Sequence, residues 1–182
     1  SSAASDVYKR QVSQCQKLMR YLETGEPTES ELAGNYDNNL LNKVVRDNKE
    51  VVINNKQLND KLQMVFELSN LSIWKYNIQE MERVKILRYE NGGKYKWHTD
   101  TGAKETSTRK LTAVVQLSDE TKYEGGNLEF GITDDSGEKN YTAPRTRGSI
   151  IVFPSFLSHR VTPITKGRRY SLITWMNGDT WK

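Results

Sequence analysis

From Ile73 to the end of the chain, the sequence is a succession of short β-prone runs separated by turn-forming residues. Runs rich in Val, Ile, Tyr and Phe, with Gly, Asp, Asn and Pro between them, are typical of β-sandwiches and barrels. We therefore expect a mainly β fold with helices against one side. The expected strands are residues 72–78, 83–90, 94–100, 110–117, 127–130, 139–143, 149–153, 158–161 and 169–176.

The residues before this region have mainly helical periodicity. Residues 12–22 and 56–71 each place apolar side chains three and four positions apart, whereas residues 51–53 form a short strand candidate. Residues 24–39 are rich in Gly, Pro and Asn and predict an irregular connection. We expect one domain over residues 12–182, with a helical part at about 12–71 and a β-rich core at about 72–182. Residues 1–11 look like an adapter-derived leader outside the fold.

Composition and charge exclude several classes of protein. With 27 Lys and Arg against 23 Asp and Glu, the net charge of +4 is too small to indicate a nucleic-acid surface. The longest apolar stretch, 150–157, is interrupted by Pro154 and falls short of the roughly 20 residues of a membrane span. The chain shows no secretory leader, so we expect a cytoplasmic protein. A single cysteine, Cys15, excludes an intrachain disulfide and a cysteine-built zinc site. The oligomeric state is not indicated.

The chain has only two histidines, and one of them, His98, belongs to a His-x-Asp pair that can bind a metal. His98 and Asp100 are two residues apart at the end of an expected strand, so their side chains lie on the same face. With His159, they supply the two histidines and one carboxylate of non-haem Fe(II) oxygenases, which leave open positions on the metal. A His-x-Asp pair alone is a weak signal, for which two unrelated polar residues at a strand end are the commoner explanation.

The segment after His159 contains a candidate anion-binding arginine. Pro163 and Gly167 indicate a turn. If that turn centres on Ile164, His159 and Arg169 face each other across a hairpin. A guanidinium in that place can bind a carboxylate of a small molecule on the metal. The alternative is that Arg169 is a solvated turn residue.

Four motifs together carry a family resemblance. They are YENGGKYKWHTD at 89–100, GGNLEF at 125–130, HRVTP at 159–163 and RYSLITW at 169–175. Over about Ile73–Trp181, the chain resembles the 2-oxoglutarate- and Fe(II)-dependent dioxygenases, in the branch similar to prolyl 4-hydroxylases. The resemblance implies a double-stranded β-helix, the jelly roll also found in cupins, with the N-terminal helices packed on one sheet.

The resemblance also implies a set of ligands. His98, Asp100 and His159 would bind Fe(II), and Arg169 would bind the distal carboxylate of 2-oxoglutarate. O2 would be the second co-substrate, with ascorbate as a reductant.

Four further residues match co-substrate positions of the family. Tyr89, Tyr95 and Trp175 occupy positions that line its co-substrate pocket, although as strand residues they can equally fill the barrel. Some prolyl hydroxylases place a tyrosine against the distal carboxylate, where this chain has Gln116.

The implied reaction is hydroxylation of a C–H bond, with a peptidyl proline as the favoured substrate and succinate as the co-product. The same chemistry on a free amino acid or small metabolite stays open. So do a non-catalytic metal-binding jelly roll and a cupin-like enzyme or zinc hydrolase that needs no 2-oxoglutarate. Alkylated nucleic acid is disfavoured, because the related repair enzymes have a second arginine where this chain has Trp175.

Several basic residues near the motifs can favour an acidic substrate, although solvated surface charge is the commoner explanation for such residues. They are Lys94, Lys96, Lys104, Arg160, Lys166 and Arg168.

Overall fold

The computed structural model describes residues 13–20, 28–29, 45–134 and 137–181. The predicted leader at 1–11 lies outside the described residues, as does most of the predicted connection at 24–39. Residues 13–20 are helical, which confirms the described part of the first predicted helix.

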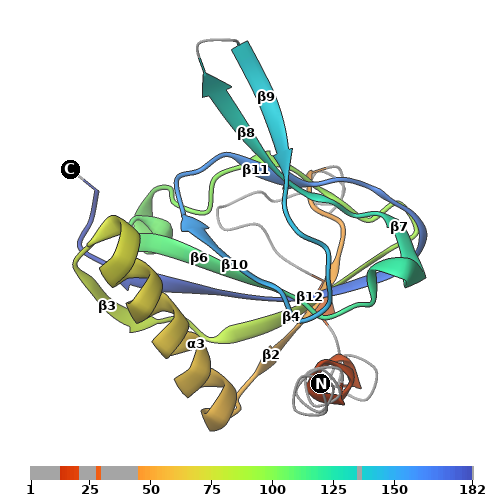
Figure 1. The fold of residues 1–182 in the computed structure, drawn as a ribbon, viewed down its shortest axis with the longest axis horizontal. Helices are drawn as coiled ribbons and strands as arrows, with labels where there is room; N and C mark the ends of the chain where they lie inside the picture. The colour runs from red at the N-terminus through yellow and green to blue at the C-terminus, as the bar shows by residue number, and fades with distance from the viewer. Residues whose placement is uncertain (1–12, 21–27, 30–44, 135–136, 182) are drawn as a thin grey trace, which may run out of the picture.

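The larger of two sheets has eight strands (Figure 1). Its order is β1-β2-β4-β12-β6-β10, and β3 and β7 also pair with β12. All of these pairings are antiparallel. The strands are β1 (Thr28–Glu29), β2 (Lys49–Ile53), β3 (Ile78–Met81), β4 (Val84–Glu90), β6 (Arg109–Gln116), β7 (Tyr123–Gly125), β10 (Ile150–Pro154) and β12 (Ile164–Gly178).

The smaller sheet has four antiparallel strands in the order β5-β11-β8-β9. They are β5 (Tyr95–His98), β8 (Leu128–Asp134), β9 (Gly137–Thr142) and β11 (His159–Val161). The β8–β9 hairpin projects from the body of the protein (Figure 1). One buried apolar cluster joins the two sheets, with Leu87 and Val114 from the larger and Phe130 and Val161 from the smaller. Two sheets closed around a shared interior are the predicted jelly-roll arrangement.

Helices cover the outer face of the larger sheet, as predicted. Helix α3 (Lys56–Ser69) begins after Asn55, whose side-chain oxygen accepts a hydrogen bond from the Leu58 N–H. Its buried Leu62 belongs to a cluster with Ile86 and Leu172 of the sheet, to which the 13–20 helix contributes Cys15. No helix in the described part of the chain is both long and apolar enough to cross a membrane.

The strand predicted at 72–78 is wrong. Asn70–Trp74 instead forms a π-helical turn that continues α3, and Lys75 then adopts a left-handed conformation with φ 57°. The side chain of Asn70 stabilises this exit, because it accepts a hydrogen bond from the N–H of Tyr76 and donates one to its carbonyl oxygen. The strand begins only at Ile78, as β3.

The hairpin predicted between His159 and Arg169 is also wrong. Strand β11 pairs with β5 and β8, whereas β12 pairs with β4 and β6, so the two residues lie in different sheets. The connecting residues bond elsewhere: the N–H of Thr162 donates to Asn127, and that of Ile164 donates to Gly93. Pro163, between them, has no N–H to donate. The chain therefore crosses from one sheet to the other instead of folding back.

Strand β12 determines what faces the interior between the sheets. Residues 169–176 are all buried, because successive side chains point to opposite covered faces. Arg169, Ser171, Ile173 and Trp175 face the space between the sheets. The alternate residues Tyr170, Leu172 and Met176 pack in the outer clusters under the helices.

The close approach of β7 to β12 requires glycine at position 125. Gly125 has φ +72°, and a Cβ there would overlap the carbonyl oxygen of Pro163, whereas Gly92 has φ +85° and no atom near its Cβ position.

We expect Gly92→Ala to lower the free energy of unfolding by about 1 kcal/mol through backbone strain alone. Gly125→Ala should cost at least about 2 kcal/mol, because the overlap adds to the strain. Urea unfolding measures both, and equal losses would contradict this account.

Candidate metal centre and anion pocket

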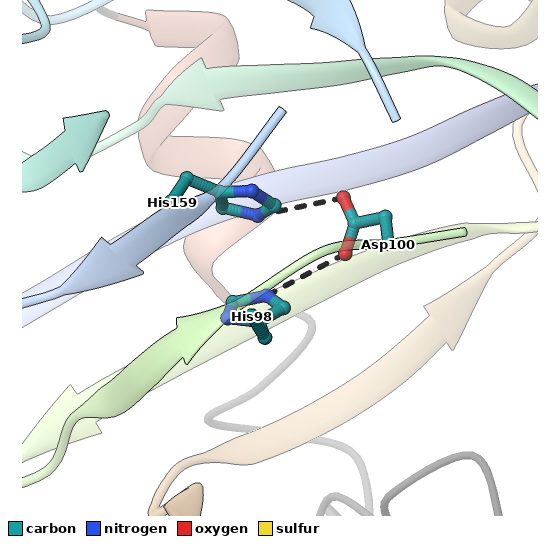
Figure 2. A group of neighbouring side chains, drawn as sticks. All are labelled: His98, Asp100 and His159. Carbon is teal, nitrogen blue, oxygen red and sulfur yellow. Dashed lines mark ion pairs between the residues drawn. The ribbon is translucent and has the colours of Figure 1, made fainter. Parts of the chain in front are cut away.

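The three predicted metal ligands lie together. Their side-chain ligand atoms are all within 4.8 Å of one another. Figure 2 shows the carboxylate of Asp100 facing both rings, with Oδ1 3.5 Å from Nε2 of His98 and Oδ2 3.5 Å from Nε2 of His159. His98 ends β5, and His159, which begins β11, pairs with it across the sheet. Strand pairing thus unites residues that are far apart in the sequence.

Both imidazoles are oriented by their own backbone. Nδ1 of His98 lies 2.7 Å from the carbonyl oxygen of Lys96, and Nδ1 of His159 lies 2.8 Å from that of Leu157. A carbonyl oxygen only accepts, so each Nδ1 carries a proton and donates it to that carbonyl, which leaves Nε2 as the ring nitrogen nearest Asp100. A ring held in this way through Nδ1 can bind a metal through Nε2.

Asp100 is held as an ionised carboxylate. Burial by itself would raise the pKa of Asp100, but hydrogen bonding and charge from His98, charge from His159 and the hydroxyl of Thr112 together hold that pKa well below its ordinary value. Thr112 donates to Oδ2 at 2.7 Å, and the backbone N–H of Asp100 donates to Ser155 at 2.8 Å. Burial lowers the pKa of His159, which favours its neutral form. The cluster therefore offers a charged carboxylate oxygen and two imidazole nitrogens.

The metal-ligand cluster faces a cavity of about 700 Å³ between the sheets, a volume that includes space open to solvent. Arg169 lines the same cavity and is only 1% exposed. Its Nη2 donates to Oε1 of Gln116 at 3.0 Å, while Nε and Nη1 have no hydrogen-bond acceptor among the described residues. The side-chain amide of Gln116 in turn donates to the carbonyl oxygen of Pro144 at 3.1 Å. A buried guanidinium with two unpaired nitrogens is suited to a small anion.

The three aromatic residues predicted near the pocket all line the cavity. Tyr95 stacks on the ring of His98, with centroids 3.4 Å apart, and burial raises the pKa of Tyr95 to about 12. Tyr89 lies beneath Arg169, whose Cζ is 5.5 Å from the ring centroid. Trp175 stacks against Arg109 at 3.8 Å. These residues thus both fill the barrel and form the cavity wall, two roles that the sequence analysis treated as alternatives.

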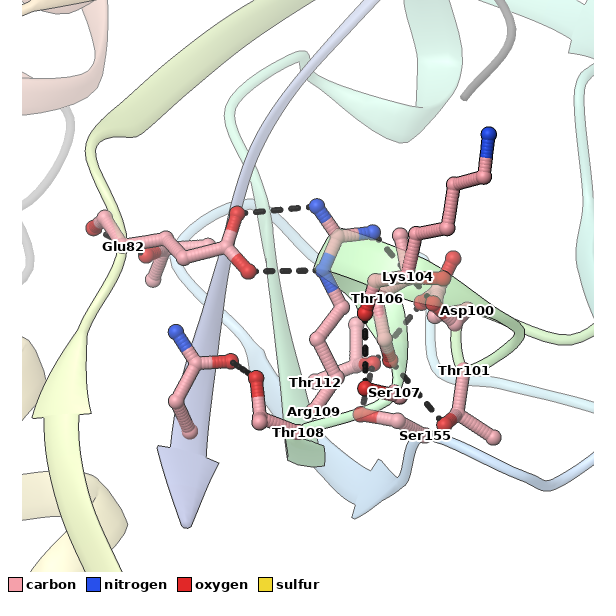
Figure 3. A network of polar contacts seen from close by, with 12 residues as sticks. Glu82, Asp100, Thr101, Lys104, Thr106, Ser107, Thr108, Arg109, Thr112 and Ser155 are labelled. Atoms are coloured by element: carbon pink, nitrogen blue, oxygen red, sulfur yellow. Dashed lines mark hydrogen bonds and ion pairs between the residues drawn. The ribbon is translucent and has the colours of Figure 1, made fainter. Parts of the chain in front are cut away.

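Sequence reasoning missed three basic residues of the cavity wall, Arg46, Lys85 and Arg109. Arg109 forms a double salt bridge with Glu82 and donates to the carbonyl oxygen of Asp100 at 3.3 Å (Figure 3). Lys85 alternates with Leu87 and Tyr89 on β4, and this period of two was the only available signal. None of the six basic residues singled out from the sequence is among the described residues that line the cavity.

Comparison with known proteins gives a consistent result. The family described as the 2OG-Fe(II) oxygenase superfamily matches residues 84–177, just over half of the chain. A PKHD-type hydroxylase of Idiomarina loihiensis is 35% identical over 98 residues, which are 54% of this chain and 43% of that protein. The chain spans about half the length of the curated relatives that it matches.

Solved structures share the fold. A Pseudomonas putida prolyl-4-hydroxylase superposes with a TM-score of 0.71 at 18% identity, covering 93% of this chain and 87% of that one. A Trichoplax adhaerens prolyl hydroxylase, solved with a hypoxia inducible factor peptide fragment, gives a TM-score of 0.72 at 19% identity, covering 98% and 79%. The predicted jelly roll is thereby confirmed.

A substitution of Thr112 tests whether its hydrogen bond to Asp100 orients the carboxylate for metal binding. We expect Thr112→Val to weaken divalent-metal binding at least about tenfold, because the carboxylate loses the hydrogen bond that orients it. Thr174→Val is the matched control: it removes another buried threonine hydroxyl, one that donates to the backbone of Glu82. Metal titration followed by protein fluorescence measures both variants, and an equal change in the two would contradict a specific role for Thr112.

Proposed function

The chain belongs to the 2OG-Fe(II) oxygenase superfamily, and we propose that it hydroxylates a prolyl residue of a peptide or protein substrate. One observation carries the proposal: a His-Asp-His cluster and a buried, incompletely paired arginine face the same cavity. A metal alone needs no such arginine, and an anion pocket alone needs no such cluster. Together they fit a metal that binds a small organic anion.

The donor set fits Fe(II). Two imidazoles and one carboxylate are the protein ligands of non-haem Fe(II) oxygenases, and they leave open positions for co-substrates. We assign His98, Asp100 and His159 to the metal. Their Nδ1 hydrogen bonds and the hydroxyl of Thr112 orient the three donors before any ligand arrives.

We assign the distal carboxylate of 2-oxoglutarate to Arg169. The guanidinium offers Nε and Nη1, while its bond to Gln116 keeps the plane of the group in place. Gln116 thus acts on the co-substrate through Arg169, as a positioning residue. When bound, Fe(II) and 2-oxoglutarate would supply the oxidative chemistry, in which 2-oxoglutarate and O2 give succinate, CO2 and the oxygen atom that enters the substrate.

The chain's remaining contribution is to position groups and exclude water. Tyr89, Tyr95 and Trp175 surround the cavity with aromatic surface, which lowers the local dielectric and strengthens the interaction of Arg169 with an anion. Tyr95 also restrains the ring of His98 by stacking on it.

The prolyl substrate is supported by the relatives. Curated relatives are PKHD-type hydroxylases, and solved structures of the same fold are prolyl hydroxylases, one of them solved with a peptide. We also assign ascorbate as the reductant that restores Fe(II).

Arg169 should control the affinity for 2-oxoglutarate. We expect Arg169→Ala to raise the Kd of 2-oxoglutarate about 100-fold, because two charge-assisted hydrogen bonds are lost. The matched control is the neighbouring Arg168→Ala, which removes the same charge from an exposed side chain that pairs with Glu90. Anaerobic titration of the metal-loaded protein measures both variants. A similar Kd in the two would contradict the assignment.

The function itself is tested with proline-containing peptides and with free proline. The protein loaded with Fe(II), 2-oxoglutarate and ascorbate should release succinate and add one oxygen atom to a peptidyl proline, as detected by mass spectrometry. Asp100→Ala should lose both products, because the metal loses its charged ligand. Oxidation of free proline alone would replace the peptidyl assignment with a small-molecule one. Full activity without 2-oxoglutarate would overturn the reaction class.

A further inference from the structure

A second charged cluster lies in the wall of the same cavity, on the β2–β4 side. Glu50, only 8% exposed, accepts hydrogen bonds from Nζ of Lys85 at 2.7 Å and from Nη2 of Arg46 at 3.2 Å. Arg46 lies over the ring of Tyr95, 5.0 Å from its centroid. Lys85 and Arg46 line the cavity, whereas Glu50 holds them from behind.

Lys85 is placed apart from the proposed co-substrate site. On β4, Tyr89 is opposite Arg169 of β12, and Lys85 is opposite Ile173. Four residues of strand separate these two levels, or about 13 Å of backbone. The ammonium group of Lys85 bonds Glu50, which pairs with Leu87, so it is held at the level between these two positions.

The ammonium group of Lys85 has hydrogen-bond donors beyond the one that bonds Glu50. An ammonium group has three N–H donors, and the described contacts of Lys85 use one of them, to Glu50. Its side chain is 29% exposed, although it lines a cavity. Lys85 also lines a second pocket with Val52 and Glu82, so its remaining donors face space that solvent or a ligand can enter.

The charges of the cavity-lining residues also favour a negatively charged ligand. Arg46, Lys85, Arg109 and Arg169 line the cavity, and Asp100 is the one carboxylate among the described lining residues. Glu50 and Glu82 neutralise part of this charge from behind. Because Fe(II) and 2-oxoglutarate carry opposite double charges, loading both leaves the balance unchanged. In the loaded cavity, basic side chains still outnumber carboxylates among the described lining residues.

We propose that Lys85, held in place by Glu50 and Arg46, binds a carboxylate of the primary substrate. The inference rests on the proposed function and adds a substrate class to it: the molecule that is hydroxylated carries a negative charge near the reacting C–H bond. That carboxylate comes either from an acidic side chain of a peptide or from a free α-carboxyl group. Both present the same group to Lys85.

The first test needs no turnover. Protein loaded with Mn(II) and 2-oxoglutarate is titrated with acetate, and the paramagnetic relaxation of the acetate methyl protons reports binding in the cavity. Zn(II)-loaded protein supplies the diamagnetic reference. We expect saturable binding that Lys85→Met weakens about tenfold and Lys85→Arg retains. Lys56→Met, which removes the same charge from an exposed side chain of α3, should match the wild type.

The outcomes separate the inference from the function it rests on. A protein that takes up Mn(II) and 2-oxoglutarate but binds acetate equally well in Lys85→Met and the wild type overturns only the role of Lys85. The same holds for a protein that binds no acetate. A protein that binds no Mn(II) overturns the proposed function, and this inference with it.

A second test identifies the source of the carboxylate. Binding of a neutral proline-centred pentapeptide is compared with that of the same peptide carrying a glutamate or a lysine, and N-acetylproline is compared with its amide. Tighter binding of the glutamate peptide, lost in Lys85→Met, assigns an acidic peptide. The same pattern for N-acetylproline over its amide assigns a free α-carboxylate. Equal binding within both comparisons, or a preference for the lysine peptide, overturns the proposal.

Discussion

The burial of β12 on both faces is the constraint on which the rest of the structure depends. One face packs under the helices with apolar residues such as Leu172 and Met176, and the other faces the second sheet. Hydrogen bonds to β4 on one side and β6 on the other keep the strand in register. This register sets Arg169 beside Tyr89 and Trp175 beside Thr112. Because the apolar packing of the outer face holds β12 in place, the inner face can carry polar groups such as Arg169.

The interior between the sheets contains more charge than an ordinary core. Burial lowers the pKa of Arg169, and two of its nitrogens lack acceptors among the described residues, while the ionised carboxylate of Asp100 lies beside two imidazoles. Unpaired buried polar groups destabilise a fold, so such an arrangement is consistent with a site built for ligands. The helices and the outer apolar clusters supply the stability that offsets it.

Prediction from sequence succeeded where the signal was local. His98 and Asp100 are two residues apart and lie together as predicted, although β5 ends at His98 and Asp100 follows the strand. Arg169 was found, but by a wrong route: the hairpin that would have set it opposite His159 does not form, because the chain crosses between sheets at Pro163. The π-helical turn at Asn70–Trp74 was missed because it depends on side-chain hydrogen bonds of Asn70 to Tyr76, which no hydrophobic period reveals.

The sequence by itself determined the mainly β class, the helices on one sheet and, through its motifs, the candidate metal ligands and the candidate arginine. Only the tertiary structure decided which basic residues enter the cavity. Lys85 and Arg46 carry no motif, and the basic residues closest to the motifs in sequence are not among those lining the cavity. The physical reason is that the interaction between two charges depends on their separation in space and not on their separation in the sequence. Pairing of β2 with β4 brings together residues that are too far apart in the sequence for a local pattern to connect them.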